Sequence, residues 1–175
     1  KYYSGNAPLL AMIIHKATGK TLSEYMSEKL WTKIGAETNA QWSLDHENGL
    51  EKAYCCVYST ARDFARIGKL YLNKGKWNGE QVVSEQYVDS SLAVAKLIGE
   101  SGQMIDHYGY SWWLMPNYKG HDIFYMRGLN GQYVFVFKDL NMIAVRLGNK
   151  RGEKKGEHLT DIYNYIDGVL KMYSN

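Results

Sequence analysis

Residues 123–137 read Ile-Phe-Tyr-Met-Arg-Gly-Leu-Asn-Gly-Gln-Tyr-Val-Phe-Val-Phe, two apolar runs separated by a short stretch rich in glycine. Runs of aromatic and β-branched residues on both sides of a turn signal are typical of paired strands. Asn130-Gly131 is the strongest short signal for a β-hairpin. The stretch therefore predicts two antiparallel strands joined by a turn, although its glycines would also allow the backbone to approach a ligand closely.

Two similar runs flank this hairpin and extend the predicted sheet. Residues 108–114 precede it, and residues 142–147 follow it after the tight link 139–141. Because the runs are apolar on both faces, the sheet needs a cover on each side. One cover is evident, an amphipathic C-terminal helix with the apolar stripe Leu159, Ile162, Tyr163, Ile166, Val169 and Leu170. The second face and one edge of the sheet have no evident partner in the sequence, so we expect an incomplete sheet.

The first hundred residues carry helical patterns instead. Residues 38–53 show no clear period and predict a long loop. The chain is thus expected to be α+β, with residues 1–100 mainly helical and residues 101–175 forming antiparallel strands and the C-terminal helix. The expected helices run from Asn6 to Gly19, from the capping box Thr21–Glu24 to Gly35, from Thr60 to Gly75, and from Ser84 through Val88.

Charge and hydropathy exclude two classes of partner. Against 21 lysines and arginines stand 18 aspartates and glutamates, a net charge of +3 in 175 residues. So small a charge does not indicate a nucleic-acid surface, and the basic run 150–155 is typical of a solvated loop. No stretch approaches the roughly 20 apolar residues of a membrane span. We therefore expect a folded domain that binds no nucleic acid and has no membrane span in this chain.

Cysteines and histidines give no sign of a metal site. Cys55 and Cys56 are adjacent, and neighbouring cysteines rarely pair, so they are expected to be two small, mostly buried side chains. The chain has no Cys-x-x-Cys pair. The histidines are scattered without the spacing of metal ligands, at His15, His46, His107, His121 and His158.

Four segments, in chain order, resemble a known family. They are residues 2–10 (Tyr-Tyr-Ser-Gly-Asn-Ala-Pro-Leu-Leu), 58–68, 108–113 (Tyr-Gly-Tyr-Ser-Trp-Trp) and 127–132. Together they resemble the β-lactamase-like serine hydrolases, which include class C β-lactamases, penicillin-binding proteins, D-alanyl-D-alanine peptidases, related esterases and 6-aminohexanoate-dimer hydrolases. The resemblance implies the β-lactamase/transpeptidase-like fold, with residues 1–175 as the C-terminal half of one such domain.

The resemblance also implies roles for single residues. Tyr2 would be the catalytic tyrosine, which relays protons, and Ser4 stands where many relatives have an asparagine that orients substrate or lysine. Gly128 occupies the family's glycine position, so the backbone N–H of Leu129 would be one oxyanion donor. Arg127 and Asn130 are candidate substrate contacts; the alternative is that they serve only the strand and the turn.

The family's nucleophile motif, Ser-x-x-Lys, does not occur in this chain. No serine is followed three residues later by lysine; Ser59 is followed by Arg62. In the family the motif precedes the tyrosine, so it is expected before Lys1 in the sequence, together with the strands that the sheet lacks. An N-terminal segment of the same domain is therefore an expected partner, and the 175-residue chain alone is expected to be inactive.

The resemblance implies a serine hydrolase that cleaves an amide or ester bond through an acyl-enzyme, without a metal or organic cofactor. Its substrate would be a small-molecule or peptide-like amide or ester, and its location the bacterial cell envelope or periplasm. The alternative is a non-catalytic ligand-binding module with the same fold. That alternative is motivated by Ser4 and by Met126-Arg127-Gly128 in place of the family's Lys-Thr-Gly pattern.

Overall fold

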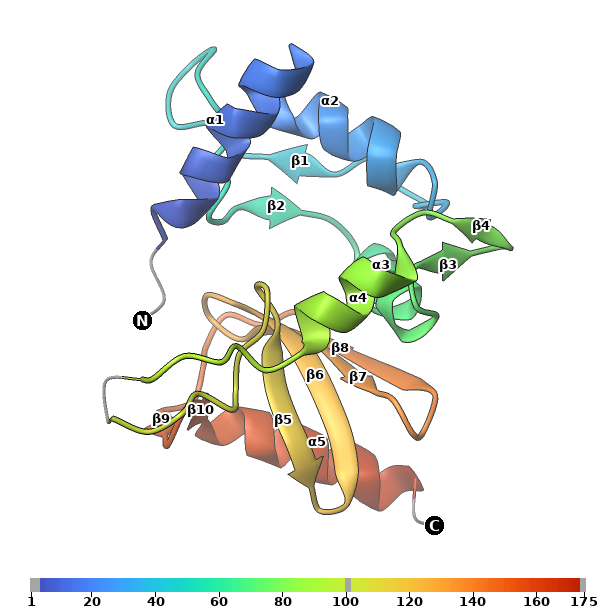
Figure 1. Ribbon diagram of the computed structural model, residues 1–175, viewed down its shortest axis with the longest axis vertical. Coiled ribbons are helices and arrows are strands. Elements are labelled where there is room, and N and C mark those ends of the chain that lie inside the picture. The colour runs from blue at the N-terminus through green and yellow to red at the C-terminus, as the bar shows by residue number, and fades with distance from the viewer. Residues whose placement is uncertain (1–3, 100–101, 174–175) are drawn as a thin grey trace.

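A computed structural model describes residues 4–99 and 102–173 of the chain. Its N-terminal helices and a small strand pair lie above a twisted antiparallel sheet, and a C-terminal helix lies below that sheet (Figure 1). The elements are α1 (Asn6–Thr18), α2 (Leu22–Met26), the π-helix η1 (Ser27–Trp31), β1 (Gln41–Trp42), β2 (Val57–Tyr58), α3 (Ala61–Leu72), β3 (Lys76–Trp77), β4 (Glu80–Gln81), α4 (Glu85–Leu92), β5 (Trp113–Tyr118), β6 (His121–Gly128), β7 (Gln132–Phe137), β8 (Met142–Arg146), β9 (Lys154–Lys155), β10 (His158–Leu159) and α5 (Thr160–Tyr173).

The predicted hairpin is the centre of the sheet. Within the described residues, β5-β6-β7-β8 is the strand order, and every neighbouring pair is antiparallel. The first strand starts later than predicted, at Trp113 rather than Tyr108. The reason is a turn in front of it: Gly109 N–H donates to the carbonyl of Trp112 over 2.9 Å, and Ser111 has a φ of 63°. Such a φ is outside the range of a strand.

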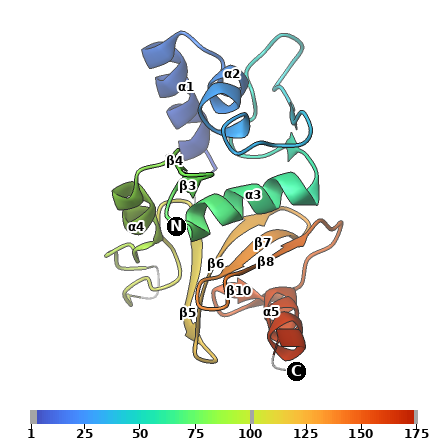
Figure 2. The same ribbon diagram turned by 90° about the vertical axis from the view of Figure 1, so that its right-hand side faces the viewer.

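Both faces of the sheet are covered, which corrects the expectation of one bare face. The C-terminal helix α5 packs on one face through Ile162 and Ile166, in a core with Tyr125 and Phe135. The helix α3 lies across the other face (Figure 2). Gly68 lets α3 come close, because a Cβ atom there would lie 3.1 Å from methyl groups of both Val134 and Val136.

The sequence did not indicate this cover because α3 serves two cores at once. Leu70 is fully buried among Trp31, Ile34 and Trp77 in the helical lobe. Its neighbour Tyr71 packs instead against the cluster on the upper face of the sheet, with its ring centroid 4.5 Å from that of Trp112. A helix whose apolar residues point in two directions shows no single stripe facing the sheet.

The outer edge of β8 fits the expectation of an incomplete sheet. Within the described part of the chain, β8 pairs with β7 and with no other strand. Its residues Met142–Arg146 are half-buried, and four of the five are apolar. An apolar strand with an open edge can accept a further strand through its free backbone N–H and C=O groups.

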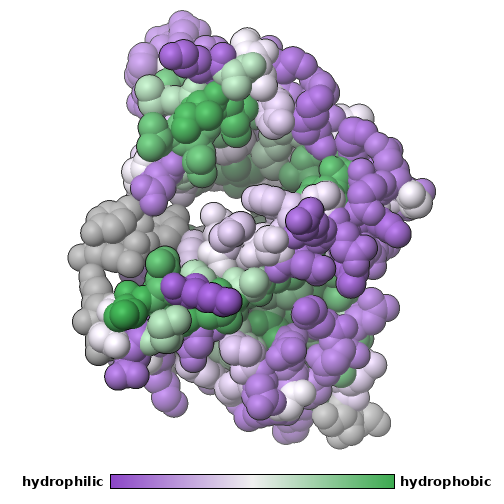
Figure 3. Space-filling model, viewed as in Figure 1, coloured by the Kyte–Doolittle hydropathy of each residue, from purple (hydrophilic) through white to green (hydrophobic). Residues whose placement is uncertain are grey.

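The first helix has the predicted position but not the predicted burial. It begins at Asn6, with Gly5 rather than Asn6 in the N-cap position and no side-chain cap. No residue of α1 is buried. Four of its large apolar side chains are more than half exposed: Leu9 (58%), Leu10 (59%), Met12 (57%) and Ile13 (54%). Figure 3 shows apolar surface on the helical lobe, at the top of the view.

Two further expectations need correction in the region after α2. The second predicted helix continues as the π-helix η1 before it ends, and the predicted loop contains β1, which pairs with β2. Cys55 and Cys56, expected to be unpaired, form a disulfide with each other. The caps of the next two helices are as predicted, because Thr60 and Ser84 each accept the backbone N–H three residues later.

The segment 58–68, one of the four that carry the family resemblance, has a structural role. Asp63 is fully buried at the start of α3. Its carboxylate accepts the backbone N–H of Glu37 over 2.7 Å and the hydroxyl of Thr38 over 2.6 Å. Burial alone would raise the pKa of Asp63, but these hydrogen bonds hold it below its ordinary value of 3.8. The residue therefore joins α3 to the loop that follows η1.

Candidate functional site

The end of the sheet that carries the β6–β7 turn points toward the N-terminal helices. In Figures 1 and 2 the first turn of α1 is the end of that helix nearer to the sheet. The space-filling view shows a hollow between the helical lobe and the sheet (Figure 3). Of the predicted site residues, Ser4 lies in the turn before α1, and residues 127–130 lie at this end of the sheet. Ser4 and the β6–β7 turn therefore both lie on the side of the molecule where the helical lobe faces the sheet.

A short turn joins β6 and β7 at the predicted place, and it has three residues, 129–131. Gly128 pairs with Gln132 in the strand register. Of the three residues between them, Asn130 and Gly131 have φ angles of 60° and 82°, left-handed values that Asn and Gly adopt most readily. Leu129 is 68% exposed. The residue whose N–H was predicted as an oxyanion donor therefore lies at the tip of an ordered hairpin, open to solvent.

Gly128 is required by a close contact rather than by its backbone angle. A Cβ atom at this position would lie 2.9 Å from the Cβ of Gln132. Real Cβ atoms almost never approach so closely, so any side chain would push the two strands apart. The glycine therefore keeps the end of β6 close to β7.

The last residues of β6 present an open backbone edge. The neighbouring strand β5 pairs with β6 only as far as Trp113 opposite Tyr125. Within the described residues, Met126–Gly128 pair with β7 alone, so one row of their backbone groups faces outward. An extended substrate backbone can bind such an edge as an added strand.

Arg127 is on the opposite face of the sheet from Met126 and Gly128. Successive side chains of a strand point to opposite faces. Met126 packs with the cluster on the α3 face, whereas the guanidinium of Arg127 lies 3.4 Å from the ring centroid of Trp113 on the α5 face. Arg127 is half-buried, and this burial lowers the pKa of its guanidinium. Its guanidinium reaches the open edge from the side of α5, not from the side of the helical lobe.

A group of aromatic and histidine residues lies beneath Arg127, and the sequence did not indicate it. The hydroxyl of Tyr125 and Nδ1 of His158 are 2.5 Å apart in the core. Burial, then the charges of His107 and Arg127, lowers the pKa of His158 to about 4. His158 is therefore neutral at pH 7. Because the residues come from separate strands and loops, no spacing in the sequence could have shown the group.

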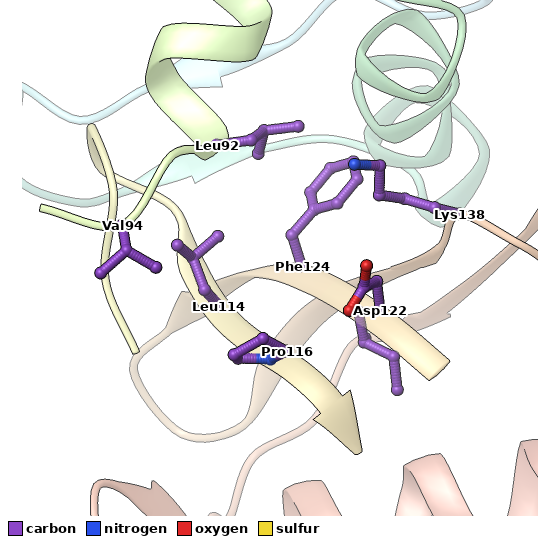
Figure 4. A pocket seen from close by; sticks show the side chains of 8 residues that line it. Leu92, Val94, Leu114, Pro116, Asp122, Phe124 and Lys138 are labelled. Carbon is purple, nitrogen blue, oxygen red and sulfur yellow. The ribbon is translucent and has the colours of Figure 1, made fainter. Parts of the chain in front are cut away.

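The described cavities lie at both ends of the sheet. A shallow pocket of about 410 Å³ beside the β6–β7 turn is lined by Gln132 and by residues 147–149. A smaller pocket of about 110 Å³ lies on the same side of the sheet as α4, between Leu92, Leu114 and Phe124, with Asp122 and Lys138 at its rim (Figure 4). None of the predicted site residues lines the smaller pocket.

The structure says little about the two site residues predicted before α1, Tyr2 and Ser4. Tyr2 lies outside the described residues, so its place relative to the turn stays a prediction. Ser4 is exposed.

In residues 4–99 and 102–173, no group of three or more histidine, cysteine, aspartate or glutamate side chains could hold a metal ion. No helix in the same ranges is long and apolar enough to cross a membrane.

Comparison with known proteins identifies the family. The family model described as Beta-lactamase matches residues 1–165 of the chain. The chain belongs to the β-lactamase family. The resemblance found in the sequence and the predicted fold class, α+β with an antiparallel sheet and a C-terminal helix, are thereby confirmed.

Similar proteins extend well beyond the length of this chain. A 6-aminohexanoate-dimer hydrolase from Paenarthrobacter ureafaciens is 30% identical in an alignment 160 residues long, which covers 85% of this chain and 39% of that protein. The structure of a putative 6-aminohexanoate-dimer hydrolase from Bacillus anthracis aligns with a TM-score of 0.81 at 31% identity, over 99% of this chain and 44% of that one.

A more distant structure supports the fold alone. The octameric penicillin-binding protein homologue from Pyrococcus abyssi aligns with a TM-score of 0.66 at 19% identity, over 97% of this chain and 42% of that one. The chain therefore spans less than half the length of each of these three relatives. This β-lactamase-family chain has the fold of a serine hydrolase family, and the roles of its single residues are proposals.

Proposed function

We propose that this chain forms part of the active site of a serine hydrolase that cleaves an amide or ester bond through an acyl-enzyme. The observation that carries the proposal is the β6–β7 hairpin. It combines an open strand edge at Met126–Gly128 with an exposed turn at Leu129, at the end of the sheet that faces the hollow. An acyl-transfer site needs such a backbone donor next to an edge that aligns the substrate.

The proposed reaction uses a serine and a lysine that lie outside this chain. The serine Oγ attacks the carbonyl carbon, and the lysine and Tyr2 relay its proton to the leaving nitrogen or oxygen as the bond to that atom breaks. The N–H of Leu129 binds the oxyanion and contributes about 3 kcal/mol to the transition state. Water then attacks the acyl carbon of the acyl-enzyme, the bond from that carbon to the serine Oγ breaks, a proton from the water passes to Oγ, and the acid is released.

The substrate is a small-molecule or peptide-like compound, and an amide is favoured. Both relatives near 30% identity are named for the dimer of 6-aminohexanoate, which is an amide. Arg127 and Asn130 are the proposed substrate contacts beside Gly128. Arg127 would act from the α5 face of the open edge, and Asn130 from the turn. Ser4 would help to orient the substrate or the lysine.

An N-terminal segment of the same domain is the proposed partner of this chain. It would supply the nucleophile, pair with the open edge of β8, and cover the exposed apolar face of α1. We place the complete protein in the bacterial cell envelope or periplasm, on the strength of the family. We also propose that the 175-residue chain alone is inactive, because the nucleophile motif is absent from it.

A non-catalytic ligand-binding module with the same fold is the second candidate. Met126-Arg127-Gly128 stands in place of the Lys-Thr-Gly pattern, and Ser4 stands in place of an asparagine. Both changes alter side chains that catalysis uses in the family and leave the hairpin backbone intact. The two candidates differ in one respect, the presence of a reactive serine.

The test is the intact mass of the complete gene-encoded protein after exposure to a fluorophosphonate and, separately, to a penicillin. We expect one fluorophosphonate adduct on a serine that is followed three residues later by lysine. A Tyr2→Phe variant should label slowly, whereas Tyr173→Phe, on an exposed tyrosine at the end of α5, should label normally. A folded protein that gains no adduct from either reagent would establish the binding module instead.

A further inference from the structure

We propose that Arg146 and Gln132 are positioning residues that hold the β6–β7 turn and thereby aim the N–H of Leu129. The proposal rests on the proposed function, and it assigns a task to two side chains to which the family resemblance gave no role. Arg146 is the last residue of β8, and Gln132 is the first residue of β7. Neither needs to touch the substrate, because each acts through the backbone that it binds.

Arg146 joins the turn to a neighbouring loop. Its Nη1 donates to the carbonyl of Gly131 over 2.6 Å and to the carbonyl of Lys150 over 2.9 Å. Hydrogen bonds from a charged donor are about twice as strong as neutral ones. One guanidinium nitrogen therefore ties the last residue of the turn to residue 150, which lies beyond the end of β8.

The guanidinium packs directly on two glycines. A Cβ atom on Gly131 would lie 1.7 Å from Nη1 of Arg146, and one on Gly148 would lie 2.4 Å from its Cζ. No other residue leaves room for the guanidinium at either place. The guanidinium thus lies between the backbone of Gly131 in the turn and the backbone of Gly148 in the loop and packs closely on both.

Residues of β7 and α5 also pack against Arg146. The guanidinium lies over the rings of Tyr133 and Tyr165, with its Cζ 5.8 Å and 5.0 Å from their centroids. Its Nη1 is 4.0 Å from Oδ2 of Asp161, which accepts the hydroxyl of Tyr133 over 2.9 Å. Burial and this hydrogen bond raise the pKa of Tyr133, so its hydroxyl stays protonated and donates.

Gln132 forms the second tie between the turn and the same loop. Its Oε1 accepts the N–H of Gly148 over 2.9 Å, and its Nε2 donates to the carbonyl of Gly148. A primary amide that binds both backbone groups of one residue fixes that residue as a strand neighbour would. The turn is consequently tied at Gly131 and at Gln132, and exposed Leu129 depends on these ties for its direction.

The predicted consequence is a loss of rate rather than of substrate binding. An oxyanion donor acts on charge that develops only in the transition state. Removal of one complete donor lowers kcat by about a hundredfold to a thousandfold, and a displacement of about 1 Å can cost a hundredfold. Without Arg146 the turn keeps the N–H of Leu129, but this N–H is no longer held in the direction of the oxyanion. We therefore expect kcat to fall about tenfold to a hundredfold.

The test uses Arg146→Gln in the complete gene-encoded protein, with Arg62→Gln as the matched control. Arg62 is 83% exposed on α3, and its nearest carboxylate, that of Glu37, is 4.0 Å away. Turnover of a nitrophenyl ester should show the fall in kcat with KM changed less than threefold. Affinity for a boronic acid, which becomes tetrahedral on the serine, should fall with kcat. The Arg62 variant should match the unsubstituted protein in each measurement.

Two additions keep the outcome decisive. Arg146→Lys keeps the charge but not the planar fork, and Gln132→Asn shortens the second tie; if Arg146→Gln does not fold, these variants carry the same test. Loss of kcat and of boronate affinity in a folded variant supports the role. If the unsubstituted protein is active and its folded variants keep kcat within twofold, the positioning role is refuted and the proposed function is not. An unsubstituted protein with no serine adduct and no turnover overturns the proposed function as well.

Discussion

Replacing Asp63 with asparagine tests the explanation given for the 58–68 segment. The change keeps the size of the side chain but removes its charge and turns one acceptor oxygen into a donor. Five groups donate hydrogen bonds to the carboxylate: the N–H groups of Glu37 and Thr38 and the hydroxyls of Thr38, Ser59 and Thr60. At least one buried donor would face an amide N–H and lose its partner.

The expected cost follows from the burial of the site. Leaving one buried polar group unpaired costs about 1–3 kcal/mol, and breaking a buried charged pair costs about 3–5 kcal/mol. Asp63 also lies 3.5 Å from Nε of Arg66, so the variant loses an ionic contact in addition to a hydrogen bond. We expect Asp63→Asn to lower the free energy of unfolding by about 3 kcal/mol at pH 7.

The assay is urea unfolding of the complete protein, followed by tryptophan fluorescence. Trp31 is a suitable reporter, because its Nε1 donates to the carbonyl of Thr38 over 2.8 Å, within the same loop. Asp89→Asn, on the exposed surface of α4, is the matched control and should change the unfolding free energy by less than about 0.5 kcal/mol. A loss below about 1 kcal/mol for Asp63→Asn would refute the role assigned to the segment.

The pH dependence gives an independent check. The pKa of Asp63 is lower in the folded protein than its ordinary value of 3.8, so the unfolded chain binds more protons in that range. Its contribution to stability is therefore complete above pH 3.8 and is lost as the pH falls through the folded-state pKa. The difference between the unsubstituted protein and Asp63→Asn should shrink in the same interval. A difference that stays constant down to pH 3 would contradict this.

Two more predictions concern the hairpin and the core. Gly128→Ala should shift the turn, because its methyl group would lie 2.9 Å from Cβ of Gln132, and the shift should lower kcat of the complete protein. The control, Gly168→Ala on open helix surface, should leave kcat unchanged. Equal kcat in both variants would refute the close contact. His158→Gln should flatten the decline of stability between pH 6.5 and pH 4, because the pKa of His158 is lowered to about 4 and its stabilisation is lost as the pH falls through that interval. The urea midpoints at pH 7 and pH 5 measure this decline, and exposed His15→Gln is the control. A His158→Gln variant whose midpoint falls as much as that of the unsubstituted protein would count against the prediction.

The parts of the fold that the sequence predicted well are those that local chemistry determines. The Asn130-Gly131 turn needs only its two residues to adopt positive φ, and the caps at Thr60 and Ser84 need only an N–H three residues away. The C-terminal helix was equally clear, because one apolar stripe faces one core. In each case the signal and the structure lie within one short segment.

The parts that were missed depend on residues far apart in the chain. The cover by α3 depends on Gly68 meeting Val134, and the hold on the turn depends on Arg146 meeting Gly131. The disulfide at Cys55 was misjudged for a different reason, since adjacent cysteines rarely pair. For the candidate site, sequence resemblance predicted a role for residues 127–132, which stays a prediction, and it could not indicate that Arg146 binds the turn.

The position of α3 has a consequence for how the hollow can select a ligand. One straight helix contributes Leu70 to the core of the helical lobe and Tyr71 to the core above the sheet. Gly68 rests against the sheet without a gap, so the helix cannot tilt without pushing Val134 aside. The two walls of the hollow therefore share one rigid support, and their separation should stay nearly constant. A ligand would then bind only if its size and shape fit the existing width of the hollow, and the two lobes would not close around it.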